Sequence, residues 1–472
     1  TTAIYTLSLH DALPIWSVDT FSERVTADLC ASIDRDFPDD AKLHDFEREQ
    51  AEHRLVARVR CSTFIGRSTD VELLSKHAMA EDATGPLLVT GDPGLGKSSL
   101  LAYWSQAHMA THPNDVFFLH FVGGTDHSTS WENIVLRMIR EISAQFNLSL
   151  EPPGRTEDLF CLLPRVLSMA AAGGRRIILV LDGLDRMDTA GDKYKLQWLP
   201  IQFPPNVRVI ISLAPGEMLD QLRQRDHKTH AVRPLSATER DDFIDRYLAR
   251  YSKALCREHK DPIVNSPPAG NPLYLNTLLN ELKLFGTHEE LADRIAYYTQ
   301  ARDTPELMRR VLLRLEHDYD THRPGLVEDV FSLMCAARWG LTESELLSLL
   351  GDVPQAVWAP LHIALEDLTF RQNGVISLTH AHLRSAVHAQ YDIGSDRLRT
   401  LRTTLADWFS ARMDHARTVD ELPWLLRETA SWNRLYDVLR RPDTFCAIWT
   451  RNRYEADRKS TRLNSSHRIR TR

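Results

Sequence analysis

Short runs of consecutive apolar residues recur along the first half of the chain. The clearest are 86–91 (PLLVTG), 116–123 (VFFLHFVG), 175–183 (RRIILVLDG) and 207–215 (VRVIISLAP), and a shorter candidate is 230–235 (HAVRPL). Continuous apolar runs, rather than alternating ones, are typical of parallel strands that are buried on both faces. Residues 97–109 and 131–146 lie between these runs and carry apolar side chains at helical spacing. The alternation predicts a parallel, doubly wound α/β sheet.

After residue 236 the pattern predicts helices only. Residues 270–286 and 304–320 give the clearest helical periodicity, and a break at 322–325 opens a further helical segment. That segment ends in an expected hairpin over 368–380, which favours a winged helix after an all-α region. Residues 20–60 are expected to form one or two charged helices.

The two ends of the chain affect both the fold prediction and the net charge. Residues 1–16 and 458–472 resemble translated sequencing-adaptor read-through, rather than a signal peptide and a basic nucleic-acid arm, and we exclude both from the fold prediction. The last 15 residues hold six basic and no acidic side chains, and the first 16 hold one acid, so the rest carries −12 instead of −7. This acidity argues against nucleic acid as the main partner.

Six scattered cysteines without a CxxC pair fit a cytoplasmic protein, and no apolar run is long enough to span a membrane.

The segment GDPGLGKSS fits the phosphate-loop pattern G-x-x-x-x-G-K-[ST] through Gly91, Gly96, Lys97 and Ser98. A strand precedes it and a helix follows, so main-chain amides and the helix N-terminus would surround phosphate groups. Lys97 would reach the β- and γ-phosphates, and Ser98 would bind Mg²⁺. The alternative is a glycine-rich turn without a ligand. We expect ATP or ADP to contact Gly91, Asp92, Pro93, Gly94, Leu95, Gly96, Lys97, Ser98 and Ser99.

A second motif, IILVLDGLD, ends the third expected strand with Asp182. The carboxyl ends of parallel strands share one sheet edge, so Asp182 would lie beside the phosphate loop and bind Mg²⁺; otherwise it caps its strand. Asp185 is a candidate for orienting the attacking water, or it is a solvated loop residue. Lys97, Asp182 and Asp185 are therefore the candidate catalytic residues.

A phosphate loop followed by LDGLD resembles the STAND class of signal-transduction NTPases, the NACHT and NB-ARC relatives within the AAA+ fold. The chain looks closest to nephrocystin-3-like and telomerase-protein-like members over about 60–457. The resemblance implies a helical tail of an upstream domain at 17–60 and an NTPase core at 61–235. It also implies a helical lid at 236–320, a winged helix at 321–392 and a helical linker towards C-terminal repeats at 393–457.

The resemblance also implies further nucleotide contacts. Arg67, in FIGR, would pack near the adenine, as would Pro272, which is otherwise a plain first-turn helix proline. His380 is the best match to a histidine that contacts the β-phosphate, although His380 and His382 flank Ala381 in an expected strand and one of them could be a packed residue. A regulatory module is a better fit for the winged helix than a DNA reader, because no basic recognition helix stands out.

Two departures from the class matter. The residue after Asp182 is Gly183, where many AAA+ enzymes have a catalytic glutamate, and SLAPGE after the fourth strand lacks the arginine of many NACHT proteins. The leading hypothesis is an ATP/ADP-controlled switch with slow hydrolysis and self-association in the ATP state, whose protein partners bind C-terminal repeats. The alternatives are an AAA+-type motor or remodelling ATPase, a non-hydrolysing nucleotide-binding scaffold and, least favoured, a small-molecule kinase.

Overall fold

The computed structural model describes residues 45–451 and a few positions between 24 and 30. Gaps within that range fall at 62–63, 82–83, 126–127, 150–155, 189–195, 226, 285–289, 352, 373, 379 and 416. The chain divides into two compact units, Thr1–Ala51 and Glu52–Arg472. The two adaptor-like ends lie outside the described residues. Helix α2 (Asp45–Cys61) begins in the first unit and ends in the second.

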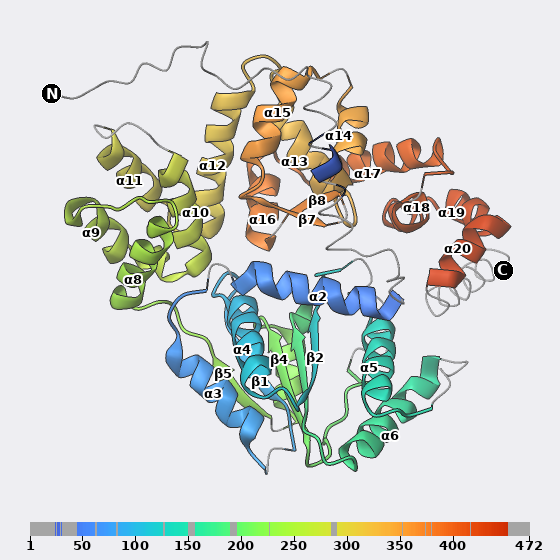
Figure 1. Ribbon diagram of the computed structural model, residues 1–472. Helices are drawn as coiled ribbons and strands as arrows, with labels where there is room; N and C mark the ends of the chain where they lie inside the picture. Colours follow the sequence, from blue (N-terminus) through green and yellow to red (C-terminus); the bar gives the residue numbers. More distant parts are fainter. Residues whose placement is uncertain are drawn as a thin grey trace. The chain divides into compact units, whose positions relative to one another are not determined.

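A five-stranded parallel sheet forms the centre of the N-terminal half of the second unit, as predicted (Figure 1). Its order is β2-β3-β4-β1-β5, with the strands β1 (Leu87–Thr90), β2 (Val116–Phe121), β3 (Ile177–Asp182), β4 (Val207–Leu213) and β5 (Lys228–Ala231). The fifth strand starts before the predicted 230–235, because Leu87 of β1 pairs with Lys228. β5 is an edge strand with mostly exposed side chains, so hydrophobicity does not mark its start.

Helices cover both faces of this sheet, and the alternation of side chains along β3 shows how. Ile177, Leu179 and Leu181 pack in one apolar cluster with α5 (Trp131–Gln145) and α6 (Leu159–Ala171). Ile178 and Val180 pack in another with α3 (Ser68–Met79) and α4 (Lys97–Thr111). A strand that is apolar on both faces is therefore buried on both, which confirms the doubly wound arrangement.

The C-terminal half is helical, as predicted. Its helices are α8 (Ala237–Ala249), α9 (Arg257–Asn265), α10 (Pro272–Leu284), α11 (Leu291–Thr299), α12 (Thr304–Tyr319), α13 (Leu326–Ala336), α14 (Glu343–Leu350), α15 (Gln355–Ala364), α16 (Ala381–Gln390), α17 (Ser395–Ser410), α18 (Thr418–Glu428), α19 (Trp432–Leu439) and α20 (Pro442–Arg451). A small antiparallel sheet, β6-β8-β7, joins β6 (Leu341–Thr342), β8 (Val375–Leu378) and β7 (Thr369–Gln372). β7 and β8 form the expected hairpin. The domain boundaries and the winged-helix assignment remain predictions.

One expectation about this region is wrong. His380 and His382 do not flank Ala381 in a strand, because β8 ends at Leu378 and α16 begins at Ala381. His380 is the residue before the helix, and His382 lies in its first turn. The buried positions Leu383, Ala386 and Val387 follow helical spacing, which explains why this segment folds as a helix.

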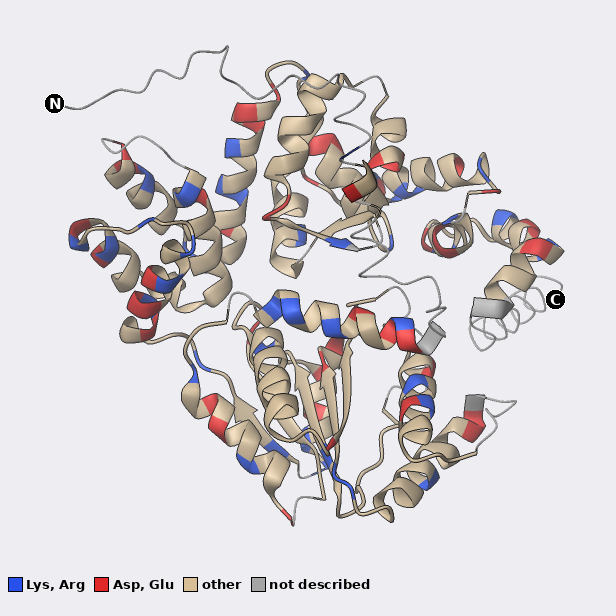
Figure 2. Ribbon diagram, viewed as in Figure 1, with Lys and Arg blue, Asp and Glu red and all other residues tan. Residues whose placement is uncertain are grey.

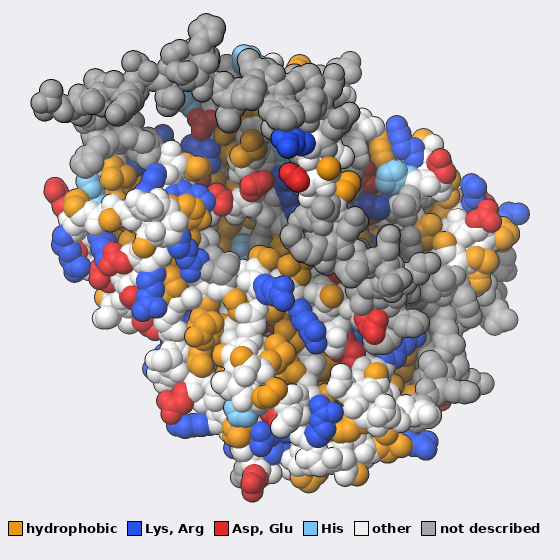
Figure 3. Space-filling model, viewed as in Figure 1, with side chains coloured by type: hydrophobic (Ala, Val, Ile, Leu, Met, Phe, Trp, Pro, Cys, Tyr) orange, Lys and Arg blue, Asp and Glu red, His pale blue; other side chains and the backbone are white. Residues whose placement is uncertain are grey.

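Residues of both charge signs are interspersed along the outer helices (Figure 2), and charged side chains of both signs are visible on the face shown in Figure 3. On α8 and α9, for example, Asp241 lies within 3.1 Å of both Arg257 and Lys260. Among the described residues, no helix has both the length and the apolar character required to cross a membrane.

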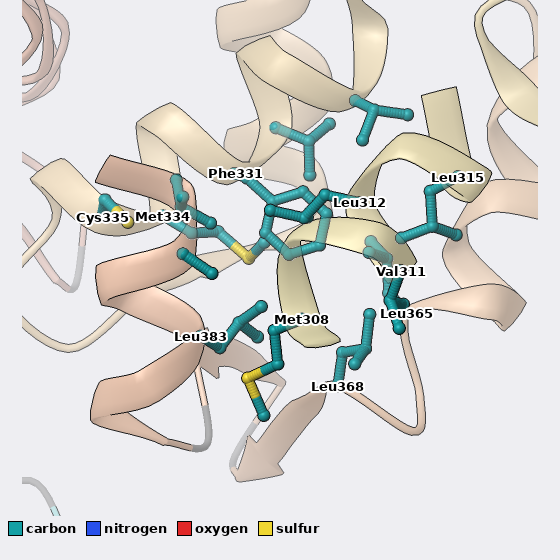
Figure 4. Close-up of a cluster of buried hydrophobic side chains, with 14 of the residues drawn as sticks. Met308, Val311, Leu312, Leu315, Phe331, Met334, Cys335, Leu365, Leu368 and Leu383 are labelled. Carbon is teal, nitrogen blue, oxygen red and sulfur yellow. The ribbon is translucent and has the colours of Figure 1, made fainter. Parts of the chain in front are cut away.

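The helical half has an apolar core of its own. Figure 4 shows Met308, Val311 and Leu312 of α12 facing Phe331 and Met334 of α13, all of them buried. Leu365 and Leu368, which follow α15, and Leu383 of α16 complete the cluster. The helices on which these side chains lie are thereby fixed to one another, including α16, whose first turn carries His382.

Candidate nucleotide-binding site

The loop between β1 and α4 has the backbone geometry of a phosphate cradle. Gly94 and Gly96 adopt left-handed φ angles of 85° and 84°, which favour glycine. A Cβ atom at Gly94 would lie 2.7 Å from Oδ1 of Asn271, so a side chain there would also collide with the helical half. Gly96 directly precedes α4, whose free N-terminal amides therefore face the loop. These features fit a bound di- or triphosphate.

Lys97 and Ser98, the first residues of α4, contact the groups that the motif requires. The ammonium group of Lys97 donates to the carbonyl oxygens of Gly91 and Asp92, the latter at 3.2 Å. Burial lowers the pKa of Lys97, while the carboxylates of Asp182 and Asp185 oppose this effect. The hydroxyl of Ser98 donates to Oδ2 of Asp182 at 2.7 Å. A hydroxyl and a carboxylate at this separation are suitable oxygen ligands for Mg²⁺.

Asp182 is fully buried at the carboxyl end of β3. Its Oδ1 accepts a hydrogen bond from the hydroxyl of Ser212 on β4 at 2.5 Å, and that hydroxyl in turn accepts from the amide of Gly183. Burial alone would raise the pKa of Asp182, but the positive charges of Arg186 and Arg60, together with the hydrogen bonds from Ser212 and Ser98, lower the pKa. Asp182 is therefore a carboxylate at neutral pH, as a metal ligand must be.

Two arginines that the sequence did not single out bind the same carboxylate. Arg60, near the end of α2, places Nη1 2.8 Å from Oδ2 of Asp182, and Arg186 places Nη2 3.1 Å from it. Gly183 makes the second contact possible, because a Cβ atom there would lie 2.1 Å from Nη2 of Arg186. The spacing of Asp182 and Arg186 gives a weak sequence signal for that pair. Arg60 lies 122 residues from Asp182 and has none.

Asp185 lies at the same edge of the sheet, with an exposed side chain. Its Oδ1 accepts a hydrogen bond of 3.0 Å from the amide of Ala214, just after β4. This bond gives Asp185 a partner while its side chain stays exposed. Its role in orienting water remains a prediction.

The side chain of Arg67 supports the phosphate loop by binding a main-chain carbonyl oxygen of the loop. The residue adopts a left-handed conformation, with φ of 61°, and Nη2 donates to the carbonyl oxygen of Leu95 at 2.8 Å. Asp70 lies 3.3 Å from Nη1, and its other oxygen is 2.7 Å from Nε2 of His230 on β5. Arg67 thus connects α3 and the edge strand to the loop, and its contact with adenine remains a prediction.

The segment that begins α10 lies against the other side of the loop. Nδ2 of Asn271 donates to the carbonyl oxygen of Pro93 at 3.1 Å. The amide of Leu273 donates to the carbonyl oxygen of Gly94 at 3.3 Å. Pro272 lies between them, and its Cγ is 3.8 Å from the position of a Cβ atom on Gly96. Pro272 is therefore beside the phosphate loop, and its contact with the base is untested.

The two histidines near α16 have different surroundings. Nε2 of His382 lies 3.1 Å from the carbonyl oxygen of Pro93, and donates to it in the tautomer with hydrogen on Nε2. His380 is reached by solvent but has many protein atoms around it. Loss of hydration, followed by the charges of Arg60, His382 and Arg186, lowers the pKa of His380 to about 3, so it is neutral at physiological pH. The direct bond to the loop is thus made by His382, which we had not predicted as a site residue. The contact of His380 with phosphate remains a prediction.

Comparison with known families agrees with this geometry. Residues 63–211 match the model of the AAA ATPase domain, a stretch that includes the phosphate loop and Asp182. This part of the chain therefore has the fold of a P-loop NTPase and resembles the AAA ATPase domain.

Longer similarities extend into the helical half. The chain is 29% identical over 406 residues to a TPR repeat-containing protein of Dictyostelium discoideum, covering 77% of this chain and 24% of that protein. It is 27% identical over 387 residues to human nephrocystin-3, covering 75% of this chain and 27% of that protein. The predicted resemblance to nephrocystin-3-like proteins is confirmed. The chain spans about a quarter of the length of these relatives.

A solved structure of similar type comes from Pyrococcus horikoshii. It is described as a Signal Transduction ATPase with Numerous Domains protein with a tetratricopeptide repeat sensor. The similar region covers 85% of this chain and 53% of the Pyrococcus chain. The identity is 14% and the TM-score is 0.47, a similarity too low to support an argument about function.

Proposed function

We propose that this chain is a nucleotide-controlled switch in which ADP and ATP stabilise different arrangements of the core and the helical half. The observation that carries the proposal is the carbonyl oxygen of Pro93 in the phosphate loop. It is bound by Asn271, which precedes α10, and by His382 of α16, each at 3.1 Å. A change in the loop on nucleotide binding would act directly on two helices of the other half. Such differential contacts are what a ligand needs to shift a conformational equilibrium.

The chain's own residues would bind nucleotide and metal as follows. Main-chain amides of the loop and of the first turn of α4 would surround the phosphates, and Lys97 would turn from the carbonyl oxygens of Gly91 and Asp92 towards them. Ser98 and Asp182 would hold Mg²⁺, which supplies neutralisation of phosphate charge. Arg67 would keep the loop in shape through the carbonyl oxygen of Leu95.

Slow hydrolysis is the second part of the proposal. Gly183 follows Asp182 where a carboxylate would be needed to activate water, and the nearest acid in sequence is Asp185. The carboxylate of Asp185 is already bound by the amide of Ala214, which limits how far it can reach. Slow turnover would let the bound nucleotide define the state of the protein for a long time, as a switch requires and a motor does not.

The remaining parts of the proposal concern partners. We propose that the ATP state self-associates, and that protein partners bind through tetratricopeptide-type repeats like those for which the Dictyostelium relative is named. Signal transduction in the cytoplasm is the setting that agrees best with such a switch.

The test uses Lys97→Ala, because removing the ammonium group deletes the side chain aimed at the β- and γ-phosphates. The matched control is Lys76→Ala, an exposed lysine on α3 whose partner is Glu72. Nucleotide released on denaturing each purified protein is quantified by ion-exchange chromatography, and the affinity for ADP is measured by calorimetry. We expect the wild type and the control to retain ADP, and Lys97→Ala to lose about 100-fold in affinity. Undiminished ADP in Lys97→Ala would overturn the proposal.

A steady-state ATPase measurement separates the switch from its rivals. A motor or remodelling enzyme would turn over rapidly without a partner. A non-hydrolysing scaffold would behave identically after Asp185→Asn, whereas the switch would accumulate in its ATP state.

A further inference from the structure

Three donors meet on a single carboxylate oxygen beside the phosphate loop. Oδ2 of Asp182 accepts from Ser98 at 2.7 Å, from Arg60 at 2.8 Å and from Arg186 at 3.1 Å. One negative charge thus faces two guanidinium groups, with the ammonium group of Lys97 close enough to respond to Asp182. The carboxylates of Asp185 and Asp92 also act on Lys97, so the excess of positive charge is confined to the two guanidinium groups that share Asp182. An additional anion would balance that excess.

Arg60 is held on a well-anchored element. Its guanidinium lies over the ring of Phe121, 4.7 Å from the ring centroid, at the end of β2. Val56 and Ala57, on the same helix, are buried in the apolar cluster that contains Phe121. The anchored helix and the ring of Phe121 thus keep the guanidinium at the carboxyl edge of the sheet. Arg186 is the more exposed of the two arginines, with side-chain exposures of 44% against 24%.

The position of Arg60 conflicts with a metal on Asp182. A divalent cation between Ser98 and Asp182 would take the oxygen that Arg60 now contacts, and like charges at a few ångströms repel strongly away from bulk water. When Mg²⁺ binds with nucleotide, Arg60 would have to move off Oδ2, as would Arg186, which shares that oxygen. The anions nearest to it would then be phosphate oxygens, and guanidinium groups bind phosphate with paired, charge-assisted hydrogen bonds.

We propose that Arg60 is a γ-phosphate ligand supplied in cis, which leaves Asp182 when MgATP binds and distinguishes ATP from ADP. This inference rests on the proposed nucleotide switch. It gives the chain a sensing arginine from α2, although the segment after β4 lacks one. The basic end of α2, which carries Arg58 and Arg60, is visible in Figure 2. Because α2 begins at Asp45, the third phosphate would be read by a helix that precedes the ATPase domain.

The experiment compares two nucleotides in three variants. Arg60→Gln removes the charge, Arg60→Lys keeps it without the paired geometry, and Arg58→Gln on the exposed side of the same helix is the matched control. Calorimetry with Mg²⁺ gives the dissociation constants of ADP and of the non-hydrolysable β,γ-imido analogue of ATP. We expect Arg60→Gln to weaken the analogue about tenfold or more and ADP by less than about threefold, with Arg60→Lys intermediate and the control unchanged.

The possible outcomes separate this inference from the proposed function. If the wild type binds neither nucleotide, the switch itself is wrong. If the wild type binds both and Arg60→Gln weakens them equally or not at all, Arg60 does not read the γ-phosphate. Circular dichroism checks folding, and should Arg60→Gln fail to fold, Arg60→Lys decides alone. A selective loss of affinity for the analogue supports the inference, and an equal loss for both nucleotides, or no loss, overturns it.

Discussion

The α/β core and the helical half contribute to the same loop in different ways. In the core, Lys97, Ser98 and Asp182 lie where β1 and β3 end and α4 begins, so short contiguous motifs bring their chemistry together. The helical half contributes Asn271 and His382, which lie 178 and 289 residues from the Pro93 carbonyl that they contact. The predicted nucleotide-binding residues thus come from local motifs, whereas the contacts between the halves depend on how whole helices pack.

The two regions also differ in how their cores are built. The sheet separates two apolar clusters, one on each face. A third cluster is continuous through the helical half, from Leu235 to Leu435, and also includes Ile65. Because each half buries most of its apolar surface in its own clusters, we expect the two to have separable stabilities. They are joined by polar contacts at the phosphate loop and by apolar contacts of Ile65 and Phe370.

The largest expected effect comes from Phe331→Ala, in the centre of the helical cluster (Figure 4). Phe331 is fully buried, and truncating such a ring costs about 3–5 kcal/mol of unfolding free energy. We expect the helical half to unfold first, leaving the core folded. Urea unfolding followed by circular dichroism should then show two transitions, with ADP binding persisting through the first.

The control is Leu313→Ala on α12, whose side chain is 44% exposed and should cost less than about 1 kcal/mol. A single transition in Phe331→Ala, with helix content and ADP binding lost together, would show that the two halves fold as one unit.

The sequence predicted the core and its motifs closely for a physical reason. Ile177, Leu179 and Val180 are apolar because the sheet is covered on both faces, so the pattern itself encodes the fold. The loop glycines are needed for backbone angles that few other residues adopt, which makes Gly94 and Gly96 recognisable. The edge strand β5 was misplaced because its side chains are largely exposed and it pairs only with β1.

The coupling residues could not be predicted in the same way. Arg60 is one of several arginines on a charged helix, and only the tertiary structure shows that it reaches Asp182. His380 and His382 look equivalent in sequence until the start of α16 at Ala381 is known. Long-range contacts of single side chains leave no periodic signal, so sequence patterns do not detect them.

A smaller effect is expected from pH, through a histidine of the core. Nε2 of the buried His77 on α3 lies 3.1 Å from the carbonyl oxygen of Val209 on β4, and burial lowers the pKa of His77 to about 4. The unfolded chain therefore binds more protons than the folded protein between about pH 4 and 6.5. The contribution of His77 to stability is fully present above about pH 6.5 and is lost as the pH falls towards 4.

His77→Gln keeps a hydrogen-bond donor but cannot titrate. We expect the wild type to lose up to about 2 kcal/mol more than this variant between pH 7 and pH 5, measured by urea unfolding of the core transition. Equal losses in both proteins would assign the acid sensitivity of the core to other groups.

The smallest effect concerns the two bonds to the carbonyl oxygen of Pro93. Asn271→Ala and His382→Ala should each cost about 0.5–1.5 kcal/mol for the bond to Pro93, and Asn271→Ala also removes the acceptor of the Leu273 amide. Since both donors share one oxygen, the loss of stability in the double variant should differ from the sum of the losses in the two single variants. ADP release, followed by stopped-flow fluorescence of a labelled nucleotide, should be faster in each variant.

His388→Ala is the matched control, because His388 also lies on α16 but bonds to the carbonyl oxygen of Ile393 instead of the loop. It should change stability without changing the rate of ADP release. If all three single variants release ADP at the wild-type rate, the helical half does not sense the phosphate loop through Pro93. The core would then bind nucleotide independently, and the two regions would be neighbours without being coupled.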